Sequence, residues 1–108
     1  MTVKDLLNNQ MFSAVNLSDP DREIKGVYIG DLLSWVMGNA QSGDAWITIM
    51  SNINILAVAT LTDCACVILS EGVTLDDEIC DTAKEKGINI LVSPASSYEV
   101  AVALSRAL

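Results

Sequence analysis

Short apolar runs recur along the second half of the chain, and each is followed by a segment with helix-forming features. Runs rich in Val, Ile, Leu and Ala predict strands, and capped segments of about ten residues predict helices. Thr74 and Asp77 have the spacing of a capping box, and so do Ser96 and Glu99. Gly87 is a natural helix end. The pattern therefore predicts three strands alternating with three helices, at residues 45–50, 53–61, 64–69, 75–86, 88–92 and 97–107.

The first half of the chain is less regular. Thr2 and Asp5 have the spacing of an approximate capping box, and Pro20 lies within a polar stretch typical of a turn. Asp31 is a natural N-cap for a short apolar helix, which Gly38 is expected to end. We therefore predict a helix, a strand, a loop, a second strand and a second helix at residues 3–9, 11–15, 16–23, 24–29 and 32–37.

Strands alternating with helices through short connections indicate βαβ units, which build a parallel sheet with right-handed crossovers. The run at 64–69 is almost purely apolar, so the sheet is expected to be covered on both faces. The helix at 53–61 is apolar nearly all round, which predicts burial on more than one side. We expect one three-layer α/β domain over residues 1–108, with a mainly parallel sheet of about four or five strands.

The charge of the chain limits its partners. Six basic against 14 acidic residues give a net charge of −8, which disfavours nucleic acids and anionic membrane surfaces. No apolar run approaches the roughly 20 residues of a membrane helix. The three cysteines are an odd number in a chain that shows no secretory signal, which favours a reducing cytoplasm.

Five segments within residues 25–107 have a distinctive sequence, at 26–40, 43–49, 54–69, 87–92 and 96–99. Together they resemble the DRTGG domain family, and the first is similar to a stand-alone subgroup of it. The family is similar to the N-terminal domains of HPr kinase/phosphorylase and of Mur ligases. The resemblance implies a regulatory or dimerising α/β domain rather than a catalytic one. The family is named for an Asp-Arg pair and a Thr-Gly-Gly triplet, whose places here hold Met50-Ser51-Asn52 and Ser70-Glu71-Gly72, so only Gly72 is retained.

The residues needed for common catalytic sites are missing from the sequence. The chain has no histidine, which excludes Ser/His and Cys/His nucleophiles, and it has no glycine-rich phosphate loop with a lysine. Cys64 and Cys66 are spaced to point to one face of a strand, but three thiols without histidine make a poor metal site, so we interpret them as core residues. The acidic cluster around Asp76–Glu78 is interpreted as a solvated helix start. We expect no enzyme, no cofactor and no metal.

Small polar residues follow the predicted strands, where ligands bind in open parallel sheets. Each group also leads into a helix, and residues in such loops are more commonly helix caps and turns, which is the favoured interpretation. If this edge binds a nucleotide or another metabolite, the candidate residues are Thr48, Ser51, Asn52, Asn54, Ser70, Glu71, Gly72 and Ser93.

The short helix at 32–37 carries more apolar side chains than one face can bury, which favours a protein interface over a crevice of its own domain. The candidate interface residues are Leu32, Leu33, Trp35, Val36, Met37 and Trp46. The leading hypothesis is a non-catalytic regulatory or interaction module that forms a homodimer or binds a protein partner in a bacterial or archaeal signalling or metabolic control system. The alternative hypothesis is a small-molecule sensor that binds at the strand ends.

Overall fold

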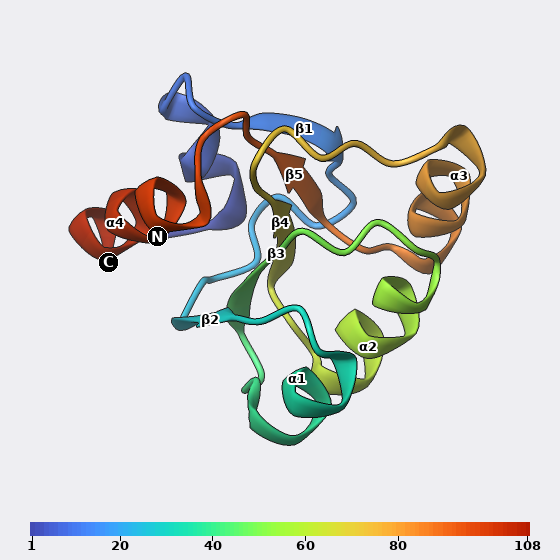
Figure 1. Cartoon of the computed structure of the whole chain (residues 1–108). Helices are drawn as coiled ribbons and strands as arrows, with labels where there is room; N and C mark the ends of the chain where they lie inside the picture. Colours follow the sequence, from blue (N-terminus) through green and yellow to red (C-terminus); the bar gives the residue numbers. More distant parts are fainter.

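The computed structural model describes all residues from Met1 to Leu108 and contains one five-stranded sheet with helices on both faces (Figure 1). The strand order is β1-β5-β4-β3-β2. β1 pairs with β5 in antiparallel orientation, and the other three pairings are parallel. The strands are β1 (Ser13–Asn16), β2 (Gly26–Ile29), β3 (Asp44–Thr48), β4 (Cys66–Leu69) and β5 (Ile90–Val92). The predicted α/β class with a mainly parallel sheet is confirmed.

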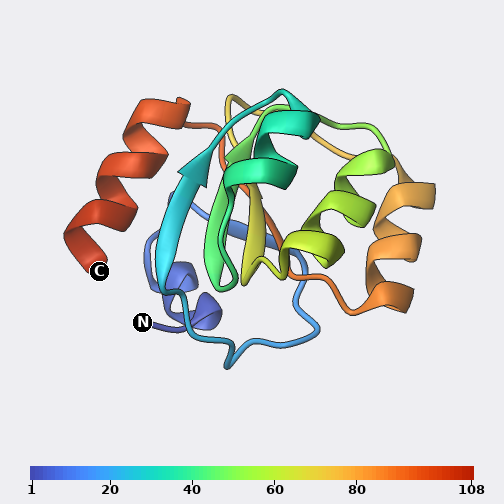
Figure 2. The ribbon, with the colours of Figure 1, turned by 90° about the horizontal axis from the view of Figure 1, so that it is seen from below.

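The helices divide between the two faces of the sheet, as Figures 1 and 2 show. The 3₁₀ helix and α4 cover one face, and α1, α2 and α3 cover the other. The helices are η1 (Val3–Asn8), α1 (Leu33–Asn39), α2 (Asn54–Thr62), α3 (Asp77–Lys86) and α4 (Ser97–Ala107). All predicted elements are present, although their ends differ by a few residues. No helix is both long and apolar enough to cross a bilayer.

The core consists of two clusters of 12 buried residues, one on each face of the sheet. Successive side chains of a strand point to opposite faces. Trp46 and Ile47, which are neighbours in β3, therefore belong to different clusters. Central strands that contribute to both clusters must be apolar at every position, which explains the unbroken apolar run of β4.

The ends of the helices show which of the predicted helix caps are present in the structure. The predicted capping box of Ser96 and Glu99 is present, and Gly87 ends α3 in the left-handed conformation at φ +71°. The predicted cap at Thr74 is wrong, because the carboxylate of Asp76 accepts the N–H of Ile79 and α3 begins at Asp77. Asp31 is not an N-cap either, because its carboxylate is bound to the end of the neighbouring strand.

Two packing predictions are also wrong. α2 is buried on one side only, and Leu61 on its outer side is mostly exposed, because no element covers the helix from outside. Cys64 and Cys66 do not share a face, because Cys64 precedes β4 and the alternation of strand side chains does not extend to it. Cys66 lies in the cluster beneath α4, whereas Cys64 packs against the opposite cluster.

Candidate functional site

The carboxyl ends of three parallel strands bring three hydroxyl side chains to one edge of the sheet. Thr48 ends β3, Ser70 follows β4 and Ser93 follows β5, and all three are buried. Thr48 Oγ1 donates to Asp31 Oδ1 at 2.8 Å, and Ser93 Oγ accepts the N–H of Ala95 at 3.1 Å. The hydroxyl groups of Thr48 and Ser93 thus form hydrogen bonds within the chain, and these bonds hold the neighbouring loops in place.

Ser70 is held by the helix that follows the last strand. Its hydroxyl is 2.6 Å from the hydroxyl of Ser97, which lies in the first turn of α4. The neighbouring Glu71 has a positive φ of 60° and its carboxylate accepts the N–H of Ser97 at 3.2 Å. Gly72 follows at φ +74°, a conformation in which glycine is favoured because a side chain would be strained. This turn therefore anchors α4 to the end of β4.

The remaining candidate residues lie on the surface before α2. The side chain of Asn52 accepts the N–H of Asn54 at 2.9 Å, which is the local turn bond typical of asparagine before a helix. Ser51 and Asn54 are exposed, and neither side chain has a hydrogen-bond partner in the chain. Of the eight predicted residues, Ser51 and Asn54 are thus the ones whose side chains are free to meet a ligand.

Asp31 also lies at this edge, although the sequence predicted it only as the cap of α1. It lies just after β2, and its Oδ1 accepts both the hydroxyl of Thr48 and the N–H of Ile49, the latter at 2.9 Å. Asp31 and Glu71 place carboxylates here, whereas no lysine or arginine lies in the loops that form the edge. The edge is consequently unfavourable for a ligand with several negative charges.

An exposed apolar surface lies on α1 next to this edge. Leu32 and Trp35, three residues apart at the start of α1, are 60% and 62% exposed, and we call these two side chains the α1 surface. Met37 is 43% exposed, but it is two residues from Trp35 and therefore lies on the other flank of the helix. Ile29, Ile49 and Ile53, at or beyond the ends of β2 and β3, are also exposed. An exposed tryptophan among aliphatic side chains is typical of protein interfaces.

Three other predicted interface residues lie inside the domain. Trp46 is fully buried in the centre of the sheet, where its Nε1 donates to the carbonyl of Gly30 at 2.9 Å. Val36 is fully buried because it is on the side of α1 that faces the sheet, and Leu33 is half-buried beside it. The expectation that Trp46 and Val36 take part in an interface is therefore wrong.

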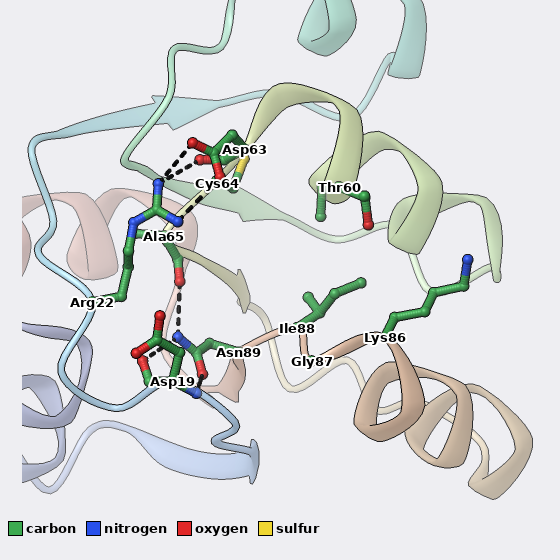
Figure 3. Close-up of a pocket in the computed structure, with 11 residues that line it drawn as sticks. Asp19, Arg22, Thr60, Asp63, Cys64, Ala65, Lys86, Gly87, Ile88 and Asn89 are labelled. Carbon is green, nitrogen blue, oxygen red and sulfur yellow. Dashed lines mark hydrogen bonds and ion pairs between the residues drawn. The ribbon is translucent and has the colours of Figure 1, made fainter.

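The cavities of the molecule lie elsewhere. One of about 170 Å³ lies at the amino ends of β4 and β5, between the ends of α2 and α3 (Figure 3). Across its wall Arg22 forms an ion pair with Asp63 at 3.0 Å, and hydrogen bonds from Arg22 and then Ser42 lower the pKa of Asp63. Asn89 bonds the backbone of Asp19 and Ala65, so its polar groups are satisfied as well.

A shallower hollow of about 380 Å³ lies between α4 and the Asn9–Met11 segment. Apolar side chains such as Met11 and Val102 line most of it. Neither cavity contains any of the predicted strand-end residues. No group of three or more His, Cys, Asp or Glu side chains is arranged to hold a metal ion.

The profile of the DRTGG domain matches residues 13–107. The chain belongs to the DRTGG domain family. Its fold is similar to that in the crystal structure of the CBS and DRTGG domains of the regulatory region of Clostridium perfringens pyrophosphatase, complexed with the activator diadenosine tetraphosphate. The TM-score is 0.76 at 18% identity, and the match covers 99% of this chain but 47% of that one, so the chain spans about half its length. No curated protein matches the sequence.

Proposed function

We propose that this DRTGG domain is a non-catalytic regulatory module that acts by self-association through the α1 surface, in the cytoplasm of a bacterium or archaeon. The observation that carries this proposal is the 62% exposure of Trp35 beside Leu32, which is 60% exposed. Support for a regulatory role comes from the similar fold, since the DRTGG domain of the pyrophosphatase lies in a regulatory region.

The energetics favour a covered α1 surface. Burying apolar surface is worth roughly 25 cal/mol per Å², and a large side chain left in water loses this contribution. Tryptophan is enriched among the residues that contribute most to binding at interfaces. Val36 already holds α1 on the sheet, so the outward tryptophan adds nothing to the core of its own domain.

Sedimentation velocity of the pure protein over a range of micromolar concentrations tests this proposal. The wild type should sediment as a dimer, and Trp35→Ala should shift it towards the monomer. Tyr98→Ala is the matched control, because Tyr98 is an aromatic residue of another helix that is 76% exposed. A wild-type monomer at every concentration, with the fold intact by circular dichroism, would contradict self-association and leave a different protein as the partner.

A second candidate function is small-molecule sensing at the strand ends, with Ser51 and Asn54 as contacts. The observation that favours it is the activator bound to the regulatory region of the similar pyrophosphatase. The lack of lysine and arginine at this edge favours a ligand with little negative charge, such as a nucleoside, over a polyphosphate.

Thermal denaturation followed by circular dichroism, with adenosine and diadenosine tetraphosphate as separate probes, tests the sensing function. A ligand at 100 times its dissociation constant adds about 2.7 kcal/mol of stability. A rise in melting temperature that Asn54→Ala removes would support the site. An unchanged melting temperature with both probes at millimolar concentration would count against sensing of adenine compounds.

A further inference from the structure

The hollow between α4 and the Asn9–Met11 segment, which we call the α4 hollow, has the size and the lining of a small-molecule site. Its volume is about 380 Å³, within the range of roughly 300–1,000 Å³ that is typical of ligand pockets. A mostly apolar surface with a few polar groups is the usual lining of such sites. Four apolar and three polar residues line the α4 hollow, namely Met11, Tyr98, Val102, Ala103, Asn9, Glu99 and Arg106.

The spacing of residues along α4 produces one wall of this hollow. Tyr98, Val102 and Arg106 follow one another at intervals of four, so they lie along one side of the helix. Val100 and Leu104 lie on a different side and are fully buried in the core. This buried pair holds α4 on the sheet, and the side with Tyr98, Val102 and Arg106 is left to line the hollow.

Two polar side chains of the α4 hollow have unused hydrogen-bond donors. Arg106 has no ion pair within the chain, and a guanidinium offers five N–H donors and no acceptor. The side-chain oxygen of Asn9 accepts the N–H of Met11 at 2.9 Å, which leaves its NH₂ group without a partner. Glu99 differs, because its Oε1 already accepts the N–H and the hydroxyl of Ser96. The groups free to bind a ligand are thus mainly donors, which favour an acceptor such as a carboxylate.

We propose that the α4 hollow binds a small aromatic carboxylate, with its ring against Tyr98 and Met11 and its carboxylate bound by Arg106. Aromatic rings pair favourably with one another, and the thioether of methionine packs favourably against a ring. An arginine can bind both oxygens of a carboxylate at once. Tyr98 and Arg106 are eight residues apart on α4, which places their Cα atoms about 12 Å apart along the helix. This separation leaves room for a ring and a short acidic side chain.

The charges around the α4 hollow limit its ligand to one acidic group. The net charge of −8 repels polyanions, and Arg106 is the only basic residue of the hollow. Glu99 adds a negative charge to the same lining. One guanidinium matches one carboxylate, whereas a phosphorylated ligand or a dicarboxylate would bring charge that no side chain of the hollow neutralises.

This site is separate from both sites considered for the proposed function. α4 and α1 cover opposite faces of the sheet (Figures 1 and 2). None of the predicted strand-end residues lines the α4 hollow. Ligand binding here is therefore an additional function, and it stands or falls independently of self-association through the α1 surface.

An NMR titration of the backbone amides, with phenylacetate as the probe, tests the site. The amides of Met11, Val102 and Ala103 should shift and saturate at millimolar phenylacetate. Phenylacetamide, which has the same ring but no charge, should bind roughly tenfold more weakly, because Arg106 then loses a charged acceptor. The absence of saturable shifts at these amides would overturn the site. Equal binding of the two probes would overturn the role of the carboxylate.

Substitution of Arg106 tests which group binds the carboxylate. Arg106→Gln should raise the dissociation constant of phenylacetate roughly tenfold and leave that of phenylacetamide unchanged. Because Arg106 is exposed in the last turn of α4, the fold should tolerate this change, as circular dichroism would show. Lys84→Gln is the matched control, since it removes one positive charge at an exposed residue of α3 that also has no ion pair. Equal effects of the two substitutions would overturn the contact with Arg106.

Substitution of Tyr98 tests the aromatic contact. Tyr98→Leu keeps an apolar side chain but loses the ring, so the dissociation constant of phenylacetate should rise roughly threefold to tenfold. An unchanged dissociation constant would overturn the placement of the ligand ring against Tyr98.

Discussion

The carboxylate of Asp31 accepts a 2.8 Å hydrogen bond from the hydroxyl of Thr48, 17 positions along the chain. This bond joins the residue that follows β2 to the last residue of β3, and a second bond to the N–H of Ile49 extends the contact. The beginning of α1 is thereby fixed to the neighbouring strand, although α1 has no side-chain cap of its own.

Asp31→Ala should lower the free energy of unfolding by roughly 1–3 kcal/mol, because Thr48 is buried and would lose the acceptor of its hydroxyl. Urea denaturation followed by circular dichroism measures the change. Asp21→Ala is the control, since Asp21 forms only an exposed ion pair with Lys4 and its loss should have little effect on stability. Equal losses in the two variants would show that the Asp31 contact is not a structural one.

Two glycine substitutions should have opposite effects on stability. Gly87 ends α3 at φ +71°, so Gly87→Ala should destabilise the protein by about 1–2 kcal/mol. Gly38 lies within α1 with open space around it, so Gly38→Ala should stabilise the protein by about 0.5–1 kcal/mol. Urea midpoints of both variants measure the difference. A destabilising Gly38→Ala would mean that this end of α1 needs the conformational freedom of glycine.

The ion pair of Arg22 and Asp63 should make stability depend on pH in the acid range. Hydrogen bonds from Arg22 and Ser42 hold the pKa of Asp63 below its usual 3.8. A carboxyl group with a lowered pKa stabilises the folded state above the unfolded value, and this contribution disappears as the pH falls through the folded value. Arg22→Gln should therefore raise the pKa of Asp63, as measured by NMR titration, and should have its largest effect on stability above pH 3.8.

A control for this titration is Lys4→Gln, which removes an ion pair with Asp21 and should leave Asp63 unchanged. Ser42→Ala should raise the pKa of Asp63 less than Arg22→Gln does, because the Arg22 hydrogen bond has the larger effect. An Asp63 pKa that does not respond to Arg22→Gln would contradict the ion pair in solution.

The three thiols should react with iodoacetamide at different rates. Burial raises the pKa of Cys66 far above its usual value, and burial also raises the pKa of Cys64. Slight burial and then Asp77 and Asp81 raise the pKa of Cys80, which is the most accessible to solvent of the three. Because the thiolate is the reactive form, alkylation at pH 8 should follow the order Cys80, Cys64, Cys66.

Mass spectrometry of the peptides measures the alkylation rates. The control is the same measurement in concentrated urea, which unfolds small domains. All three thiols are then exposed, so their alkylation rates should become similar. Rapid reaction of Cys66 in the native protein would contradict its position in the core.

Local sequence signals predicted the elements because apolar runs and helix caps act over a few residues. Ser96 with Glu99 is such a signal, and it holds in the structure. Asp31 carries the same signal before α1, but Thr48 competes for its carboxylate through a contact that only the folded sheet creates. Local patterns could not reveal that contact, nor the antiparallel pairing of β1 at the far edge of the sheet.

The candidate site was predicted in part for the same reason. That Thr48, Ser70 and Ser93 lie at one edge follows from the parallel strands. That their hydroxyls are already bonded within the chain depends on Asp31, Ser97 and Ala95, which approach them only in three dimensions. Trp35 and Trp46 look alike in sequence, and their burial is decided by whether the residue lies on the outer side of a helix or in a central strand.

This difference between the two tryptophans gives the protein a pair of intrinsic fluorescent reporters. Trp46, enclosed in the core, should emit at short wavelength and resist quenching by iodide until the domain unfolds. Trp35, on the surface, should emit at longer wavelength and be quenched readily in the monomer. One emission spectrum therefore separates loss of the fold from loss of an interface, without any added label.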